Sequence, residues 1–425
     1  MVSQAVILAG GLGTRLKDVN GRTPKFLTQI NGRTVADIQL QEVTESGIRK
    51  VLLLLGNGSQ EIIDYIEKSP WKKKLEFTYV YESHPLGTGG AVCSALELLE
   101  DQFLLICGDI YFNQVLPKFI SLAAPNKNLL GVRASDHIGD SNLVAVNLSR
   151  NVTRILRKPH EKNFRNIALT GVAVLQKSFI STLRDEYGKS KFDLDSEGYP
   201  TGLQKHVAFE AMHLPGYLKD IGTPARIAEV SEKDKKDLSP ENKAIFLDRD
   251  GVINREVGRV NNISDLKLSS DLGYFVKSVR NLGFRVLVVT NQPGIARGDI
   301  TFEDLEGMHA KIDHELALHD TRIDEFFVCP HYPESGFEGE IKELKVDCPC
   351  RKPKPGLLKE AIDRYEISAL KSFMIGNANS DFLAASAVRI PYINIGLSGL
   401  PNMEYSTVDS LTRALEIIKG QANDN

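Results

Sequence analysis

The stretches AVILAGGLGTR at residues 5–15 and AIFLDRDG at residues 244–251 share one plan: a short apolar run followed at once by glycine or aspartate. Such a run has the length and composition of a buried strand in a parallel sheet. This pattern and the stretches of helical period between the runs predict an α/β protein with two doubly wound, mainly parallel sheets in tandem, whose ligands gather at the carboxyl ends of the strands. The other predicted strands are residues 51–55, 103–107, 285–289 and 372–375.

The chain of 425 residues is long enough for two or three domains. Residues 231–243, SEKDKKDLSPENK, contain almost no apolar side chain and include a proline. This is the composition of an exposed connection between separately packed units. We therefore expect one domain over residues 1–230 and a second over residues 244–425.

The overall composition argues against several classes of protein. Fifty-two basic side chains against 55 acidic ones give a net charge of −3, which argues against nucleic-acid and anionic-lipid partners. The longest apolar runs are far shorter than the roughly 20 residues that cross a bilayer, and the first residues lack the basic segment of a secretory signal. We expect a cytoplasmic protein with reduced cysteines, and the sequence leaves open whether it forms a homo-oligomer.

The glycine-rich turn after the first apolar run suits a phosphorylated ligand. Gly10, Gly11 and Gly13 let backbone N–H groups approach a triphosphate, and Arg15 and Lys25 can neutralise its charge. A glycine turn alone is also typical of a tight strand–helix connection, but the two cations favour the ligand.

This segment resembles the signature of the sugar-1-phosphate nucleotidylyltransferases, and the resemblance extends over most of residues 1–228. Residues 82–91, ESHPLGTGGA, resemble the loop that meets the nucleobase. The resemblance implies a Mg²⁺-dependent transfer of a nucleotidyl group from a nucleoside triphosphate to a sugar 1-phosphate, with release of pyrophosphate. It implies that Gly10, Gly11, Gly13, Thr14, Gly87, Lys158, Thr170 and Gly171 bind the substrates, that Arg15 and Lys25 are catalytic, and that Asp109 and Asp220 hold Mg²⁺.

The aspartates Asp248 and Asp250 follow a predicted strand at a spacing that suits a nucleophile and a proton shuttle beside one metal ion. Solvated surface acids are the alternative, which the apolar run directly before them disfavours. The segment resembles the haloacid dehalogenase superfamily. That resemblance implies that Asp248 forms an aspartyl phosphate, that Asp250 protonates the leaving oxygen and then activates water, and that both meet Mg²⁺.

Two further segments resemble the next motifs of that superfamily. Thr290 and Asn291 would bind the transferring phosphoryl group. Lys352 would stabilise the charge on the nucleophile and the phosphate, and Arg351 would reach a substrate phosphate or hydroxyl.

The fourth motif departs from the superfamily pattern. Asn377 stands where an aspartate normally binds Mg²⁺, so one formal charge is lost unless Asp381 compensates. Because the nucleophile, the shuttle and the lysine are intact, we expect an active phosphatase. A degenerate domain retained as a scaffold is the alternative.

Three of the five cysteines lie in one pattern, with Cys329 and His331 at one end of a loop and Cys348 and Cys350 at the other. Three thiolates and an imidazole suit a closed tetrahedral Zn²⁺ site with a structural role, whereas buried reduced cysteines are the alternative. Because Cys350 adjoins Arg351, the zinc would also fix the backbone that aims the cations after it.

Residues 244–400 resemble the D-glycero-D-manno-heptose 1,7-bisphosphate 7-phosphatases, and the N-terminal half resembles the D-glycero-α-D-manno-heptose-1-phosphate guanylyltransferases. The phosphatase leaves a sugar 1-phosphate and the transferase consumes one, so we expect successive steps with GTP and a phosphorylated heptose as substrates. Two alternatives stay open: a transferase joined to a non-catalytic binding module, and a different sugar with UTP, CTP or ATP as donor.

Overall fold

The computed structural model describes residues 2–11, 23–56, 58–136, 138–160, 164–235, 242–256, 258, 260–396 and 405–423. The chain divides into two compact units. The first comprises residues 1–133, 142–157 and 168–239, and the second comprises residues 134–141, 158–167 and 240–425. The second unit therefore includes two short segments from the N-terminal half of the chain.

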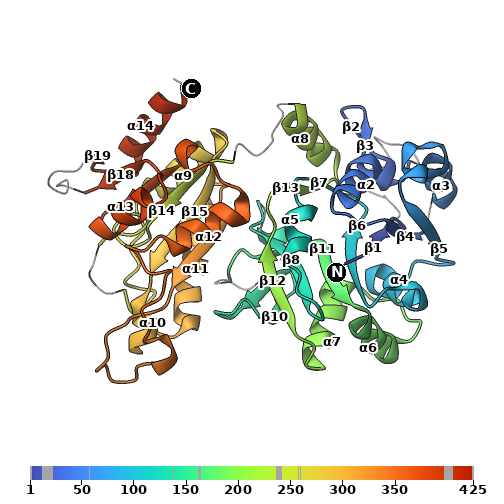
Figure 1. Ribbon diagram of the computed structural model, residues 1–425, viewed down its shortest axis with the longest axis horizontal. Helices are drawn as coiled ribbons and strands as arrows, with labels where there is room; N and C mark the ends of the chain where they lie inside the picture. Colours follow the sequence, from blue (N-terminus) through green and yellow to red (C-terminus); the bar gives the residue numbers. More distant parts are fainter. Residues whose placement is uncertain are drawn as a thin grey trace. The chain divides into compact units, whose positions relative to one another are not determined.

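A mixed sheet of nine strands forms the centre of the first unit (Figure 1). Its strands are β1 (Gln4–Leu8), β4 (Lys50–Leu55), β5 (Glu76–Tyr81), β6 (Gln102–Cys107), β8 (Asn128–Arg133), β9 (Leu143–Val146), β10 (Val152–Leu156), β11 (Ala168–Gln176) and β12 (Phe209–His213). The main path runs β10-β9-β11-β6-β1-β4-β5, and β8 joins β11 to β12. β1 pairs in parallel with β4 and β6, and β4 pairs in parallel with β5, whereas β11 is antiparallel to β6 and β8. The carboxyl ends of the parallel strands thus meet at one edge of the sheet.

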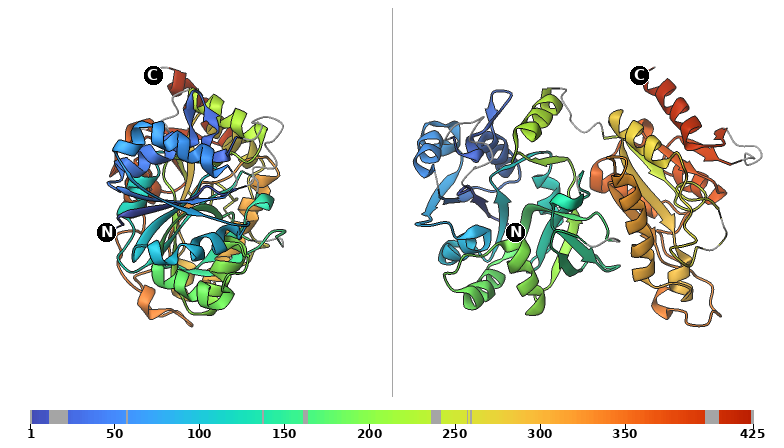
Figure 2. Two further views of the ribbon diagram at one scale, coloured as in Figure 1. Left: turned by 90° about the vertical axis from the view of Figure 1, so that its right-hand side faces the viewer. Right: turned by 180° about the vertical axis from the view of Figure 1, so that it is seen from behind.

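Helices cover both faces of this sheet. Figures 1 and 2 show α2 (Val35–Glu45) and α3 (Ser59–Lys68) on one face and α4 (Gly87–Ser94) and α6 (Lys177–Tyr187) on the other. The strands between them are apolar and buried, as a sheet covered on two faces requires. The remaining α-helices are α5 (Leu116–Ser121), α7 (Tyr199–Gln204) and α8 (Pro224–Lys235), and the shorter helices are η2 (Lys25–Leu27), η3 (Pro70–Lys73), η4 (Leu96–Leu98) and η6 (Leu194–Gly198).

Two small sheets accompany the large one. β2 (Gln29–Ile30) pairs with β3 (Arg33–Thr34), and β7 (Ile110–Asn113) pairs antiparallel with β13 (Tyr217–Asp220). The second pairing matters for the site, because it joins the segment after β6 to a segment about 100 residues later in the chain.

A parallel sheet of six strands forms the centre of the second unit, in the order β16-β15-β14-β17-β18-β19. Its strands are β14 (Ala244–Leu247), β15 (Arg285–Asn291), β16 (Glu325–Cys329), β17 (Phe373–Gly376), β18 (Tyr392–Ile395) and β19 (Ser406–Val408). The α-helices are α9 (Leu272–Asn281), α10 (Pro293–Arg297), α11 (Phe302–Ala317), α12 (Gly356–Tyr365), α13 (Asn379–Ser386) and α14 (Leu411–Asn423), and the shorter helices are η5 (Ile138–Asp140), η7 (Lys342–Leu344) and η8 (Ala369–Lys371).

Alternate side chains of β14 enter different cores. Ile245 and Leu247 pack with residues of α9, α11 and α14, whereas Ala244 and Phe246 pack with residues of α12 and α13. All four are fully buried. A strand with both faces buried reads as a continuous apolar run, which is why the sequence shows no polar alternation there.

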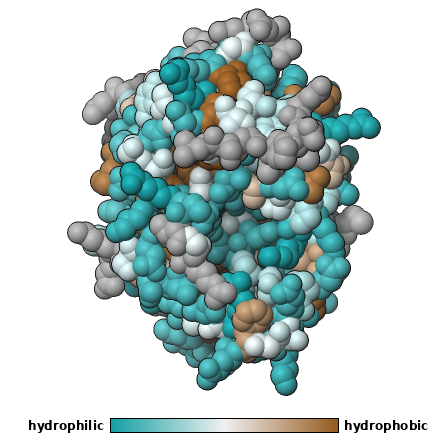
Figure 3. All heavy atoms as spheres, turned by 90° about the vertical axis from the view of Figure 1, so that its left-hand side faces the viewer, coloured by the Kyte–Doolittle hydropathy of each residue, from teal (hydrophilic) through white to brown (hydrophobic). Residues whose placement is uncertain are grey.

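The predicted α/β fold class is confirmed, and each of the six predicted runs lies within or overlaps a strand of one of the two large sheets. On the face drawn in Figure 3, hydrophilic residues predominate and hydrophobic ones form small groups. Within the described ranges, no helix has the length and apolar character needed to cross a membrane.

Candidate active sites and metal centre

A cavity of about 330 Å³ lies at the carboxyl ends of β1 and β6 in the first unit. Five predicted site residues line it together: Gly10, Gly11, Lys25, Gly87 and Asp109. Its other lining residues are Leu8, Ala9, Phe26, Leu54, Glu82, Pro85, Thr88, Ala91, Cys107, Gly108 and Lys191. The predicted residues Gly13, Thr14 and Arg15 lie outside the described residues.

The glycines of the predicted nucleobase loop are needed for close packing. Gly87 has φ +72°, and a Cβ there would lie 2.4 Å from the carbonyl oxygen of Phe192. A Cβ on Gly89 would lie 2.1 Å from the Phe192 ring, while the Gly89 N–H donates to the Phe192 carbonyl at 3.1 Å. Thr88 adds to the contact, because its hydroxyl donates to Asp193 at 2.9 Å. The segment around Phe192 thus fixes the loop through close contacts with Gly87 and Gly89, which a side chain at either position would block.

The two predicted metal carboxylates of the first unit lie side by side: Asp109 directly precedes β7, and Asp220 ends β13, which pairs with β7. Asp220 pairs with Ile110 in the β13–β7 ladder, and the N–H of Ile221 donates to the carbonyl of Asp109 at 2.9 Å. Asp109 Oδ2 lies 2.7 Å from Lys25 Nζ, and Asp220 Oδ1 lies 2.5 Å from Arg226 Nη1. Carboxylate oxygens are the donors that Mg²⁺ prefers, so the residues fit the predicted ion.

Three predicted sugar-site residues do not line this cavity. The hydroxyl of Thr170 donates to the carbonyl of Gly131 at 2.7 Å, inside the sheet. Gly171 has φ +73° and a Cβ there would lie 2.8 Å from Cys107 Sγ, so its lack of a side chain serves packing. Lys158 belongs to the second unit, where its Nζ donates to the carbonyl of Asp140 at 2.7 Å.

Lys191, Glu82 and Thr88 also line the cavity, and no pattern in the sequence singles them out individually. Glu82 and Thr88 lie inside the predicted nucleobase loop, and burial raises the pKa of Glu82. Lys191 lies about 100 residues away from that loop, immediately before Phe192, and no motif marks it. Only the contact of Phe192 with the loop could have revealed it.

In the second unit, Lys352 lies between the carboxylate of Asp248, which follows β14, and that of Asp381, which lies in the first turn of α13. Its Nζ lies 2.8 Å from Asp248 Oδ1 and 2.6 Å from Asp381 Oδ1, and it donates to the carbonyl of Val289 at 2.8 Å. The Lys352 side chain is 2% exposed and that of Asp381 is 1% exposed. The three predicted residues therefore form one buried charged cluster.

The buried cluster shifts the pKa values of Asp248 and Lys352. Burial raises the pKa of Asp248 to about 7, and the charges of Asp381 and Asp250 act in the same direction, whereas Lys352 opposes them. Burial alone would lower the pKa of Lys352, but the two carboxylates beside it hold that pKa above its usual value. Lys352 is thus a fixed positive charge beside the Asp248 carboxylate.

Asp250 accepts hydrogen bonds from three side chains. Arg249 Nη2 lies 2.9 Å from both carboxylate oxygens, and Arg249 Nε lies 3.1 Å from Oδ1. Asn254 Nδ2 donates to Oδ1 at 3.1 Å, and Gln292 Nε2 donates to Oδ2 at 2.9 Å. Sequence reasoning did not select Arg249, Asn254 or Gln292.

The predicted phosphoryl-binding residues lie at the end of β15. Thr290 is buried, and its hydroxyl accepts a hydrogen bond from Gln292 at 2.9 Å. The side-chain amide of Asn291 makes two bonds to the backbone of Lys352: its Nδ2 donates to the carbonyl at 2.9 Å, and its Oδ1 accepts from the N–H at 3.0 Å. Asn291 thereby fixes the Lys352 loop.

Asn377 and Asp381 follow β17. A Cβ on Gly251 would lie 2.0 Å from Asn377 Nδ2, so this glycine lets the amide approach the turn after Asp250. Asp381 Oδ2 accepts from the N–H groups of Asn377 and Ala378 at 3.2 and 3.1 Å. The oxygens of Asp248 and Asn377 and the carbonyl of Asp250 are hard donors that fit Mg²⁺.

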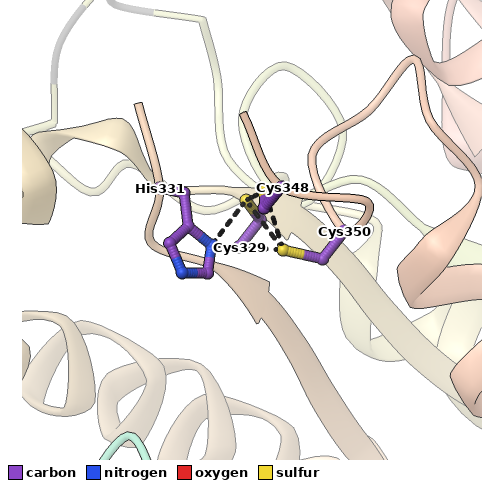
Figure 4. Close-up of side chains that lie close together, drawn as sticks. All are labelled: Cys329, His331, Cys348 and Cys350. Atoms are coloured by element: carbon purple, nitrogen blue, oxygen red, sulfur yellow. Dashed lines mark hydrogen bonds between the residues drawn. The ribbon is translucent and has the colours of Figure 1, made fainter. Parts of the chain in front are cut away.

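The predicted zinc ligands lie together (Figure 4). The side chains of Cys329, His331, Cys348 and Cys350 point toward one another, and their ligand atoms lie within 4.8 Å of one another. The Sγ atoms are 3.0 to 3.5 Å apart, and His331 Nδ1 lies 3.2 Å from Cys350 Sγ. Zn–S bonds of ~2.3 Å place tetrahedral ligands roughly 3.8 Å apart, so the cluster has nearly the size of a closed site.

Arg351 packs beside this cluster. Its Nη1 donates to the carbonyl of His331 at 3.4 Å, and its guanidinium lies 5.1 Å from the centre of the Tyr332 ring. The loop that carries the cysteines therefore also places Arg351, which directly precedes Lys352 in the chain.

The chain is similar to known proteins of two kinds, nucleotidyl transferases and heptose-bisphosphate phosphatases. A family model described as nucleotidyl transferase matches residues 4–237. The D-glycero-alpha-D-manno-heptose-1,7-bisphosphate 7-phosphatase of Photorhabdus laumondii is 37% identical over 162 residues, which are 38% of this chain and 86% of that protein. The chain belongs to the nucleotidyl transferase family, and its second half belongs to the heptose-bisphosphate 7-phosphatase family. This transferase–phosphatase is therefore an enzyme with two activities.

Two further relatives extend the comparison. The D-glycero-beta-D-manno-heptose-1,7-bisphosphate 7-phosphatase of Escherichia coli K12 is 38% identical over 147 residues, which are 35% of this transferase–phosphatase and 75% of that protein. The structure of apo UDP-glucose pyrophosphorylase covers 56% of this chain and 99% of its own, with 18% identity and a TM-score of 0.51. The second similarity shows the fold of the first half.

Proposed function

We propose that this transferase–phosphatase performs two successive steps in the synthesis of a nucleotide-activated heptose. The phosphatase removes the 7-phosphate of a D-glycero-D-manno-heptose 1,7-bisphosphate. The transferase then passes GMP from GTP to the remaining 1-phosphate and releases pyrophosphate. We assign the transferase to residues 1–230, the connection to residues 231–243 and the phosphatase to residues 244–425.

In the phosphatase, Asp248 attacks the phosphorus of the 7-phosphate and forms an aspartyl phosphate, while the sugar oxygen leaves with a proton from Asp250. Water then attacks the phosphorus, Asp250 takes its proton, and inorganic phosphate leaves. Lys352 offsets charge on the nucleophile and the phosphoryl group, and Thr290 holds a phosphoryl oxygen. The buried cluster of Asp248, Lys352 and Asp381 is the observation that carries this assignment.

In the transferase, an oxygen of the sugar 1-phosphate attacks the α-phosphorus of the nucleotide in line, and pyrophosphate leaves. Lys25 and Arg15 offset charge on the phosphates, and the backbone around Gly10, Gly11 and Gly13 binds them. Gly87 and its loop receive the base. Lys158, Thr170 and Gly171 are assigned to the sugar phosphate by family resemblance.

Metal ions complete both sites in this proposal. Mg²⁺, when bound, offsets the negative charge of the transferring phosphoryl groups. Asp109 and Asp220 would hold it in the transferase; Asp248, the carbonyl of Asp250 and Asn377 would hold it in the phosphatase, with Asp381 nearby. Zn²⁺ would be structural, because the four cysteine and histidine ligands leave no open position. Since thiolate ligands require a reducing compartment, we place both reactions in the cytoplasm.

The substrates follow from the relatives of each half. The phosphatase relatives act, by their names, on the α and the β anomers of the heptose bisphosphate. The assignment of GTP rests on the resemblance of the N-terminal half to the guanylyltransferases. Both anomers and all four nucleotides therefore belong in the test.

The test incubates the purified chain with each anomer of heptose 1,7-bisphosphate and with GTP, ATP, CTP or UTP, and follows phosphate and pyrophosphate separately. We expect phosphate release without nucleotide, and pyrophosphate release only when GTP and the dephosphorylated sugar are present. Asp248→Asn should abolish phosphate release and leave transfer to a supplied heptose 1-phosphate unchanged. Phosphate without pyrophosphate under every condition would refute the paired steps.

Asn377 favours one alternative, a phosphatase half that binds but does not hydrolyse. Under that alternative the chain releases no phosphate but still releases pyrophosphate from heptose 1-phosphate. Asn377→Asp would then create hydrolysis where the unmodified chain has none.

A further inference from the structure

Arg249 is a buried cation beside the phosphatase site that the catalytic assignment does not use. Arg249 stands between Asp248 and Asp250 in the sequence, and it is 1% exposed. Its guanidinium meets the Asp250 carboxylate through Nε and Nη2 at 2.9 to 3.1 Å, whereas its Nη1 lies 4.0 Å from Met308 Sδ. Burying an arginine has a substantial desolvation cost unless its guanidinium is paired, and here the Asp250 carboxylate is the partner. The question is what this buried pair does for Asp250.

A tight turn makes this contact between sequence neighbours possible. Side chains at adjacent positions of an extended chain point to opposite sides. After β14, however, the N–H groups of Ile253 and Asn254 donate to the Arg249 carbonyl at 2.9 and 3.1 Å, and Gly251 adopts φ +83°. The chain folds back on itself, so Asn254 also reaches Asp250.

A second contact ties Asp250 to the phosphoryl-binding end of β15. Gln292 is 5% exposed, and its Nε2 lies 2.9 Å from both Asp250 Oδ2 and Thr290 Oγ1. One amide group therefore sets the separation between the proton shuttle and the hydroxyl assigned to the phosphoryl group. The Asp250 side chain is 27% exposed. Arg249 and Gln292 are buried, so they contact its carboxylate from the protein interior.

We propose that Arg249 and Gln292 are positioning residues that hold the Asp250 carboxylate where it can transfer a proton to the leaving oxygen. The inference rests on the proposed phosphatase activity and adds two residues to it. Two donors on different elements fix both the place and the rotation of the carboxylate, which a single contact would not. Proton transfer by a positioned group typically contributes about 10²–10⁴-fold to a rate, so misplacement of Asp250 should be measurable.

The test uses leaving groups that differ in their need for a proton. An alkoxide, such as the sugar oxygen, leaves poorly without protonation, whereas p-nitrophenolate leaves well without it. Full-length Arg249→Met and Gln292→Met variants are compared with the unmodified chain on an alkyl phosphate and on p-nitrophenyl phosphate. We expect kcat/KM for the alkyl ester to fall about 10²-fold more than kcat/KM for the aryl ester. Arg249→Lys, which keeps a cation, should restore part of the ratio.

Arg364→Met is the matched control, since Arg364 is also a buried arginine of this unit and pairs with Glu325 and Glu360. It should leave the alkyl-to-aryl ratio within about threefold of the unmodified chain. Equal losses on both esters in the Arg249 and Gln292 variants would overturn the proposal. If Arg249→Met does not fold, Gln292→Met alone decides. An unmodified chain that hydrolyses neither ester would refute the phosphatase itself and the inference with it.

Discussion

Replacing Lys352 by methionine should destabilise the second unit as well as abolish its hydrolysis. The ammonium lies 2.8 and 2.6 Å from two carboxylates that are 13% and 1% exposed. At an effective dielectric constant of about 20, one such pair is worth about 6 kcal/mol before desolvation. Removing one partner of a buried pair typically costs about 3–5 kcal/mol, because the remaining charge has no compensation. We expect a loss in that range for Lys352→Met.

Hydrogen exchange is the suitable assay, because a chain of two units has no single free energy of unfolding. Peptides from β14 and β17 report the opening free energy around the cluster, and phosphate release reports activity. Lys354→Met is the matched control: its partner Asp347 is 77% exposed, so the change should stay within about 1 kcal/mol.

A second substitution separates stability from activity. Adding Asp381→Asn to Lys352→Met removes one uncompensated charge while keeping an oxygen that can accept from the N–H groups of Asn377 and Ala378. The double variant should regain at least about 1 kcal/mol of the opening free energy measured by hydrogen exchange. It should not regain hydrolysis. A Lys352→Met variant that keeps the protection of β14 would refute the buried-charge reasoning.

Three further substitutions test other parts of the molecule. Cys348→Ser should lower the zinc content measured by elemental analysis and reduce phosphate release with it, while pyrophosphate release stays unchanged. Lys25→Met should lower pyrophosphate release about 10²-fold, as loss of one charge-stabilising donor typically does, and leave phosphate release unchanged; equal loss of both would contradict it. Burial lowers the pKa of His309 to about 4, so between about pH 6.5 and 4 the unfolded state binds a proton that the folded state does not, and stability falls as the pH falls. His309→Leu should remove up to about 3 kcal/mol of that acid dependence, read by hydrogen exchange of α11.

Local patterns predicted the parts of the sites that lie on single strand ends. The turns after β1 and β14 carry their chemistry within a few residues, so the sequence alone selected Gly10, Gly11, Asp248 and Asp250. The cluster of Cys329, His331, Cys348 and Cys350 was also predictable, because two pairs of cysteine or histidine residues with a short spacing within each pair are a pattern that few other sites share.

Contacts between distant segments could not be predicted. Phe192 fixes the glycine loop around Gly87 through its carbonyl and ring, and it brings Lys191 to the cavity, yet neither residue lies in a motif. Asn291 was selected for the phosphoryl group, but its amide is bonded at both ends to the backbone of Lys352. The same polar residue types occur among residues that support a site and among residues that bind a ligand, so the sequence alone does not distinguish the two roles.

The loop that carries Lys352 shows why this phosphatase would need a metal for its structure. Lys352 must lie within about 3 Å of two buried carboxylates, but residues 331–347 before it are mostly exposed and supply little apolar surface. A loop with so few buried contacts opens easily unless other bonds hold it. The amide of Asn291 holds it on one side of Lys352, and Cys350 holds it two residues earlier. Zinc binding would therefore stabilise this loop, as apolar packing stabilises the strands. Loss of the ion should disorder the loop that carries Lys352 before the sheet itself unfolds.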